Sequence, residues 1–448
     1  MTNSAPDLAT ICTPVSLLDV GRWAPVGVVV FVALWPLPGL AATVLTLSAL
    51  LASYHLIRYR FRGGTQLLDG PVWALTSVFF MAYWLPQVVS LFGALDLSET
   101  LRKVATDLRY LPFMWLCAIA VATPERRDRT FRGLAAIGLV WTLDALAQAV
   151  FGTSPLFWLL NQLKQGMGGY GFCTSQEMIL ADRLSGIFGP CNLKLGQILA
   201  TLSPFVLFAV QRRSFTLWLL AVVVIGIVLL LAGSRASWIT YGLILMLSGW
   251  RLLGMRRLLG LSVLFLPLTV AVVAFSPQTR ERIYRTAAIF ADHGGGVDKA
   301  LSGRSQIWHA AVCMIRAHPF SGVGVRGFRD AYPACDPTPD RMPAWGTGPA
   351  LHAHQIVLEI LSETGVIGLL LWVAGAAMAW RAWRYAATTA RDRARPAMIS
   401  LLATVFPFNT HLAFYSSFWG ALMLMLAGLY AGALLQDRDG KKAGPADG

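Results

Sequence analysis

Twelve long apolar runs recur from one end of the chain to the other, separated by segments in which arginine is concentrated. A membrane-spanning helix needs about 20 predominantly apolar residues, and most of the runs approach that length. Only 13% of the 448 residues are charged and 56% are hydrophobic, whereas soluble globular chains carry about 25% charged residues. This pattern excludes a disordered chain, a coiled coil and a small disulfide-stapled fold. We therefore predict an all-α polytopic membrane protein with about 12 transmembrane helices.

The predicted spans cover residues 24–38, 40–57, 71–92, 108–123, 133–151, 194–211, 215–232, 237–251, 258–275, 361–381, 397–415 and 417–436. Arginine and lysine fall in every second connecting segment, among them 58–62, 126–132, 212–213, 251–257, 381–395 and 438–442. This alternation follows the positive-inside rule when the N-terminus is cytoplasmic. The formal net charge of +14 is therefore a topology signal, and no nucleic-acid partner is expected. The polar start of the chain predicts no cleaved signal peptide.

These spans divide the chain into five parts. We predict a cytoplasmic N-terminus (1–23), nine spans within 24–275, a large periplasmic loop (276–360), three spans within 361–436 and a cytoplasmic tail (437–448). A second long outer segment covers residues 152–193, and loops of this length usually carry function or structure of their own. Helical spacing predicts a helix over 305–317, and the Gly-, Pro- and Asp-rich stretch 330–348 is predicted as a loop.

The topology places several arginines and histidines on the outer side, where anion capture could be combined with a general base. Arginine binds phosphate oxygens through two parallel donors and does not lose its proton, and histidine is the usual base for activating a hydroxyl. This chemistry suits a diphosphate leaving group and a sugar hydroxyl. The candidates are Arg183, Arg235 and Arg304 for the diphosphate, His354 as the base, and Ser234, His352 and His411 in supporting roles.

Each candidate has an ordinary structural alternative. Arg235 could be an interfacial anchor that reaches the lipid head groups, and Arg183 and Arg304 could be common surface arginines of long loops. His354 could be a loop histidine at a helix start, and no carboxylate follows it at a spacing of four. On a helix, His352 would point away from His354, which favours a structural or substrate-contact role for it.

Other patterns in the sequence give weaker evidence for a functional site. The stretch 322–327 spells GxGxxG but follows a His-Pro turn instead of a strand, so a glycine-rich turn near the site is the better interpretation. Asp437 and Asp439 lie in the predicted tail, away from every candidate, and no cluster has metal-ligand spacing. The sequence permits, without establishing, the disulfides Cys173–Cys191 and Cys313–Cys335 in outer loops.

Five motifs resemble the O-antigen ligase/polymerase superfamily, over roughly residues 180–435. They are the Gly-Ser-Arg-Ala turn at 233–236, Arg304 with Trp308, the His-Pro-Phe-x-Gly-x-Gly-x-x-x-Phe run at 318–328, His354 with Leu358, and Glu-Thr-Gly at 363–365. The family usually has His-Asn where this chain has His354 and Gln355.

The resemblance implies a GT-C-like, inverting glycosyltransferase in the bacterial inner membrane, with its active site facing the periplasm and without metal or other cofactor. It would transfer O-antigen glycan from undecaprenyl diphosphate to lipid A–core during lipopolysaccharide assembly, with His354 as general base and Arg183, Arg235 and Arg304 as diphosphate ligands. Its partners would be the two lipid-linked substrates and membrane lipids. The alternatives are an O-antigen polymerase and a protein O-oligosaccharyltransferase. A transporter or lipid flippase is an alternative from a different class, although it predicts charged residues inside the spans.

Overall fold

The computed structural model describes residues 20–62, 67–179, 183–264, 304–339, 348–407 and 413–436, with single helical positions between 267 and 284. The predicted tail, nearly all of the predicted N-terminal segment, most of the run 258–275, residues 285–303 and His411 lie outside the described residues. The described parts are helical, without a strand among them. The longer helices are α1 (Val20–Ala33), α2 (Pro38–Arg62), α3 (Gly70–Val89), α5 (Tyr110–Ile119), α6 (Pro124–Phe151), α9 (Leu195–Gln211), α10 (Phe215–Leu231), α11 (Arg235–Leu264), α17 (Ile356–Tyr385), α18 (Thr388–Thr404) and α19 (Ser417–Leu435).

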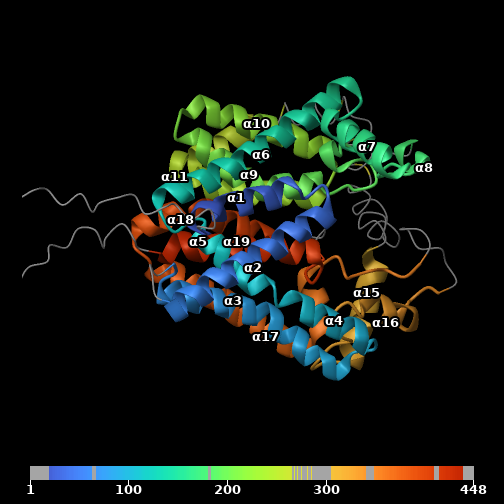
Figure 1. Cartoon of the computed structure of the whole chain (residues 1–448). Coiled ribbons are helices and arrows are strands. Elements are labelled where there is room, and N and C mark those ends of the chain that lie inside the picture. The colour runs from blue at the N-terminus through green and yellow to red at the C-terminus, as the bar shows by residue number, and fades with distance from the viewer. Residues whose placement is uncertain are drawn as a thin grey trace, which may run out of the picture.

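Helix α19 forms the centre of this bundle (Figure 1). Its residues from Trp419 to Leu434 are buried on every side, as expected for a helix that is apolar all round. It packs against α18, α5 and α3, and α3 in turn packs against α17. On the other side of the bundle, α9 packs against α6, α10, α11 and α18. One continuous apolar core therefore joins the first helix to the last.

Within the described ranges, five helices are long and apolar enough to cross a membrane: α2, α3, α6, α17 and α19. Three shorter apolar helices are α1, α9 and α10. Gly254, with φ +73°, interrupts α11 between the predicted spans 237–251 and 258–275. The chain is thus an all-α, multi-pass membrane protein, and the figure of 12 spans stays a prediction.

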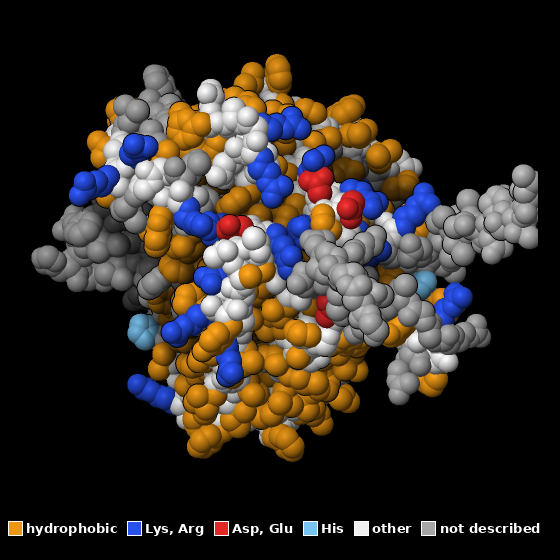
Figure 2. All heavy atoms as spheres, turned by 90° about the vertical axis from the view of Figure 1, so that its left-hand side faces the viewer, with side chains coloured by type: hydrophobic (Ala, Val, Ile, Leu, Met, Phe, Trp, Pro, Cys, Tyr) orange, Lys and Arg blue, Asp and Glu red, His pale blue; other side chains and the backbone are white. Residues whose placement is uncertain are grey.

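Segments predicted to be basic and cytoplasmic meet at one end of the bundle. The guanidinium of Arg126 lies against Gly21 near the start of α1, and Arg251 of α11 pairs with Asp392 of α18 at 2.7 Å. Arg393 donates to backbone carbonyls at the end of α19. Figure 2 shows lysine and arginine side chains gathered across this end of the molecule among hydrophobic ones.

Shorter helices cap the opposite end, where α4 (Leu97–Asp107), α7 (Pro155–Gly168), α8 (Ser175–Ile179), α15 (Arg304–Ala317) and α16 (Phe328–Cys335) lie (Figure 1). The helix predicted over 305–317 is confirmed as α15. The prediction of a loop over 330–348 is wrong at its start, because α16 continues to Cys335. Phe328, Ala331 and Tyr332 of α16 pack against α15 in a second small apolar core, and this burial outweighs Pro333 within the helix.

Candidate functional site

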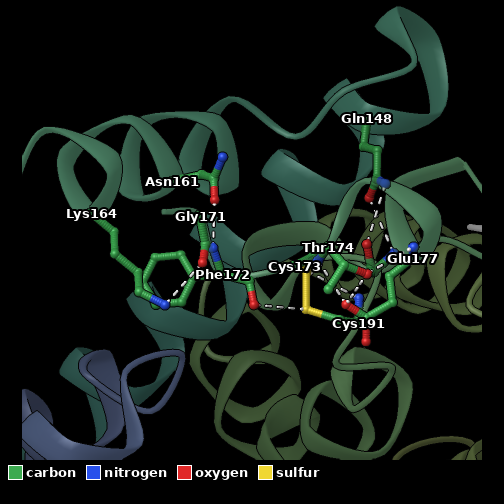
Figure 3. The surroundings of a disulfide bond; sticks show 10 residues. Gln148, Asn161, Lys164, Gly171, Phe172, Cys173, Thr174, Glu177 and Cys191 are labelled. Carbon is green, nitrogen blue, oxygen red and sulfur yellow. Dashed lines mark hydrogen bonds between the residues drawn. A yellow bond between two sulfur atoms is a disulfide. The ribbon is translucent and has the colours of Figure 1, made fainter. Parts of the chain in front are cut away.

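Arg183 lies in a segment that is fixed on two sides. The side chain of Gln148 in α6 accepts hydrogen bonds from the backbone N–H groups of Ser185 (3.1 Å) and Gly186 (2.7 Å). The disulfide Cys173–Cys191 closes the surrounding loop, and Figure 3 shows both restraints side by side. Leu184 also donates to the carbonyl of Leu231 at the end of α10 (3.4 Å), which places Arg183 beside the turn that leads to Arg235.

Ser234 and Arg235 occupy the tight turn between α10 and α11. Gly233 makes the turn in the left-handed region, with φ +66°. The Ser237 hydroxyl donates to the Ser234 carbonyl (2.7 Å), and the Trp238 indole N–H donates to Leu229 across the helix pair (2.8 Å). Arg235 is the first residue of α11, where the helix dipole is positive. A cation at that end of a helix is unfavourable on its own, so the position favours a bound anion.

Arg304, in α15, joins the other two arginines. Burial first, and then the nearby charges of Arg235 and Arg183, lower the pKa of the Arg304 guanidinium to about 10. Three arginines that are separated widely in the sequence thus share one electropositive region. Such a concentration of positive charge can attract a multiply charged anion, because guanidinium groups donate to phosphate oxygens in pairs.

The same helix connects the arginines to the histidines. Trp308 follows Arg304 by four residues and therefore shares its side of α15. The Trp308 indole N–H donates to the carbonyl of Ala353 at 3.1 Å, next to His354. The Arg304 and Trp308 motif therefore has a structural explanation: one turn of helix carries the buried arginine and the indole that hydrogen-bonds to the histidine loop.

His352 and His354 lie together, so the prediction that they point apart is wrong. Residues 351–355 precede α17 and are not helical, and His354 has φ +53°. This left-handed backbone brings the two imidazole rings to 3.9 Å between centroids. Non-glycine residues with positive φ are uncommon and concentrate at functional sites.

Gln355, where the family resemblance leads us to expect asparagine, caps α17. Its side-chain oxygen accepts a hydrogen bond from the backbone N–H of Leu358 at 2.6 Å. Asparagine is a preferred residue for this position, and the longer glutamine side chain makes the equivalent bond here. The departure from the family pattern therefore preserves the start of the helix after His354.

The glycine-rich stretch is a structural clamp instead of a nucleotide-binding loop. Residues 318–328, which we call the glycine clamp, pair with the kink of α17 at Gly365. Val323 donates to Ser362 (2.9 Å), and Val366 donates back to Pro319 (2.8 Å). A Cβ on Gly322 would lie 2.3 Å from the Glu363 carbonyl carbon, so only glycine permits this approach. The clamp holds α15 and α16 against α17, and hence Arg304 near His354.

The sequence analysis missed a group of buried polar residues beneath the clamp. Glu363 accepts from the backbone N–H of Arg326 (2.9 Å), whose φ is +70°. In α4, Lys103 forms a buried ion pair with Asp107, which also accepts from Gln87 (3.1 Å). The spacing of four between Lys103 and Asp107 was the available signal. We overlooked this signal because α4 turns Leu97 and Leu101 outward and Lys103 and Asp107 inward.

The cysteines also form the two pairs that the sequence permitted, Cys173–Cys191 and Cys313–Cys335. The second disulfide ties α15 to the end of α16. Groups of three residues suited to hold a metal ion are absent from the described part of the chain. The arrangement therefore offers anion binding through three arginines and proton transfer through a histidine.

Comparison with known proteins shows which family the segment around this site resembles. Residues 197–373 match the family model described as O-antigen ligase. This segment of the chain is similar to the O-antigen ligase family. A curated relative, the exopolysaccharide production protein ExoQ of Rhizobium meliloti (strain 1021), is 28% identical over 127 residues. The alignment covers 22% of this chain and 27% of that relative's length.

The O-antigen ligase segment contains most of the candidate site. Arg235, Arg304 and His354 lie within it, together with the glycine clamp and the kink at Gly365. Arg183 lies shortly before it and is brought to the other arginines by the contacts of Gln148 and Leu231. The family resemblance predicted from the sequence is thus confirmed, whereas the roles of the individual residues belong to a proposal.

Proposed function

We propose that the protein is an inverting glycosyltransferase that moves a glycan from undecaprenyl diphosphate to the lipid A–core acceptor. The observation that carries this proposal is the grouping of Arg183, Arg235 and Arg304 beside the loop of His354, within an O-antigen ligase segment. The GT-C-like architecture, the absence of a cofactor and the inner-membrane location are parts of the same proposal.

In the proposed reaction, the acceptor hydroxyl attacks the anomeric carbon of the glycan from the side opposite the diphosphate. A new glycosidic C–O bond forms while the bond between the anomeric carbon and the diphosphate oxygen breaks. His354 takes the hydroxyl proton, and the electron pair leaves with the diphosphate. The three arginines stabilise the charge that develops there, since fixed donors around a developing anion are among the largest contributions to catalysis. His352, against the His354 ring, would help to orient it.

The end of the molecule that carries this site is proposed to face the periplasm. Both disulfides lie at this end, and disulfides persist in oxidising compartments. The basic segments lie at the other end, as expected for the cytoplasmic side. His411 stays a candidate supporting residue, and Ser234 is a positioning residue of the turn that carries Arg235.

An O-antigen polymerase is the second candidate, and the relative named for exopolysaccharide production favours it. A polymerase would use the same diphosphate site and the same base, with a second lipid-linked glycan as acceptor. The arginines and His354 therefore do not discriminate between the two activities.

The deciding experiment is a transfer assay with purified protein, labelled glycan on undecaprenyl diphosphate, lipid A–core and EDTA. We expect label on lipid A–core in the wild type and a rate lowered at least 100-fold in His354→Ala, in keeping with the contribution of a general base. His309→Ala is the matched control, because His309 is exposed on α15 and should retain activity.

Longer glycan on the carrier lipid would instead identify a polymerase. Full activity of His354→Ala would remove His354 as the base, and absence of transfer by folded, donor-binding wild type would contradict the glycosyltransferase assignment.

A further inference from the structure

An apolar cavity of about 490 Å³ opens at the side of the bundle, away from the candidate site, and Trp250 and Trp380 in its lining are more than half exposed. Its lining comes mainly from α3, α11, α17, α18 and α19, and includes the aromatic residues Trp250, Trp372, Trp380 and Trp383. Its size falls within the range of about 300–1,000 Å³ that is typical of ligand pockets.

The packing of the surrounding helices explains why the space remains. Helix α17 lies close against α3, where a Cβ on Gly375 would be 2.6 Å from that of Ala82. Helix α11 instead packs against α18 and α9. The small side chains Gly375, Ala376 and Ala379 line the cavity without filling it. An empty apolar space forfeits dispersion contacts, so within a bilayer a lipid chain would occupy it.

Two arginines stand in the lining of this cavity, held by one carboxylate oxygen. Oδ1 of Asp392 accepts from Arg251 at 2.7 Å and from Arg395 at 3.1 Å. The trio carries a net charge of +1, and each guanidinium has five N–H donors, so donors remain for another anion. Arg251 and Asp392 are about half exposed, which leaves this end open to a head group.

The position of the two arginines in the lining indicates which kind of lipid the cavity would bind. Arg251 and Arg395 belong to the basic end of the molecule, whereas Tyr83, Val405 and Phe414 line other parts of the cavity. None of the candidate diphosphate ligands is in the lining, so the phosphate contacts of a lipid held inside the cavity would come from Arg251 and Arg395. Basic pockets between membrane helices bind anionic head groups on the cytoplasmic side.

We propose that this cavity is a binding site for an anionic phospholipid, whose phosphate contacts Arg251 and Arg395 and whose acyl chain fills the space between α11 and α17. The site is separate from glycan transfer. It does not depend on which acceptor the enzyme uses.

Native mass spectrometry of the purified full-length protein tests this site with phosphatidylglycerol and phosphatidylcholine of identical acyl chains. We expect phosphatidylglycerol to be retained about ten-fold more than phosphatidylcholine, equivalent to about 1.4 kcal/mol. The double variant R251Q/R395Q should abolish this preference. R212Q/R213Q, which changes an exposed basic pair between α9 and α10, is the matched control and should keep it.

Asp392→Asn provides an independent test with the opposite sign. It removes the negative charge and keeps both arginines, so retention of phosphatidylglycerol should rise. Equal retention of the two lipids, an equal loss in R212Q/R213Q, or a loss in Asp392→Asn would each overturn the proposal. Displacement of phosphatidylglycerol by undecaprenyl diphosphate, with the candidate-site arginines intact, would assign the cavity to the donor lipid instead. Since the readout is lipid retention, failure here leaves the transfer reaction untouched.

Discussion

Arg304 has surroundings unlike those of an ordinary surface arginine. Burial and the charges of Arg235 and Arg183 already lower its pKa to about 10. Lysine has an ordinary pKa of about 10.4, well below that of arginine, so the same surroundings would bring the pKa of a lysine there towards neutrality. Arg304→Lys should therefore lose its charge as the pH rises, while the wild type keeps it.

We expect the KM of Arg304→Lys for the lipid-linked donor to rise about ten-fold more than that of the wild type between pH 7 and pH 9, the size of one lost charge-assisted hydrogen bond. Steady-state transfer rates across this pH range measure the effect. Arg316→Lys, in the exposed last turn of α15, is the control and should follow the wild-type profile. Parallel profiles for both variants would mean that Arg304 does not contact the diphosphate.

The residue scale also shows what the sequence could and could not predict. Arg183, Arg235 and Arg304 were identified because topology places all three on one side of the membrane, and the structure brings them together. The contact between His352 and His354 was missed because it depends on a left-handed backbone at His354, which no spacing rule indicates. The Lys103–Asp107 pair was missed because α4 exposes Leu97 and Leu101 and buries these two charged residues, the reverse of their usual placement on an amphipathic helix.

At the scale of elements, the glycine clamp determines how α15 and α16 are held against the bundle. A Cβ on Gly365 would lie 2.1 Å from the carbonyl oxygen of Phe320, and this glycine has φ +68°. Gly365→Ala should therefore separate the clamp from α17 and move Arg304 away from His354. Because the clash is with backbone, we expect a loss of at least 2 kcal/mol in stability together with most of the transfer activity.

Thermal unfolding in detergent and the transfer assay measure these two effects. The control is Gly166→Ala in α7, where an added Cβ meets no atom within 4 Å and alanine favours a helix. Retained activity in Gly365→Ala would show that the clamp is not needed to position Arg304.

Helices were predicted best where the sequence has a long apolar run or a clear helical spacing of apolar residues. Each predicted run overlaps a helix where the structure describes it, but α5 covers only Tyr110–Ile119 of the run 108–123, and α18 ends at Thr404 within the run 397–415. Helix α15 follows its helical spacing closely. Helix α16 was missed because its glycine-, proline- and aspartate-rich surroundings indicate a loop, and its helical form depends on burial against α15. The clamp itself pairs backbone groups across distant segments, which local sequence patterns do not show.

At the scale of the whole molecule, two different groups of charged residues lie at opposite ends of the bundle. The arginine cluster and both disulfides lie at one end, and the basic loops with Arg251, Asp392 and Arg395 lie at the other. The positive-inside pattern predicts this separation, because each crossing of the membrane transfers the next loop to the other side. The cysteines then give a direct test of which end faces the periplasm.

A membrane-impermeant maleimide applied to intact spheroplasts should label Cys173, Cys191, Cys313 and Cys335 only after a reductant is added, because each pair is bonded. Cys117 is buried and should stay unlabelled in either state. In inverted vesicles the same four cysteines should resist the reagent even after reduction, since they would then face the lumen. Peptide mapping by mass spectrometry reads out each position separately. Labelling of these four in reduced inverted vesicles, and not in reduced spheroplasts, would place the arginine cluster in the cytoplasm and contradict the use of a periplasmic acceptor.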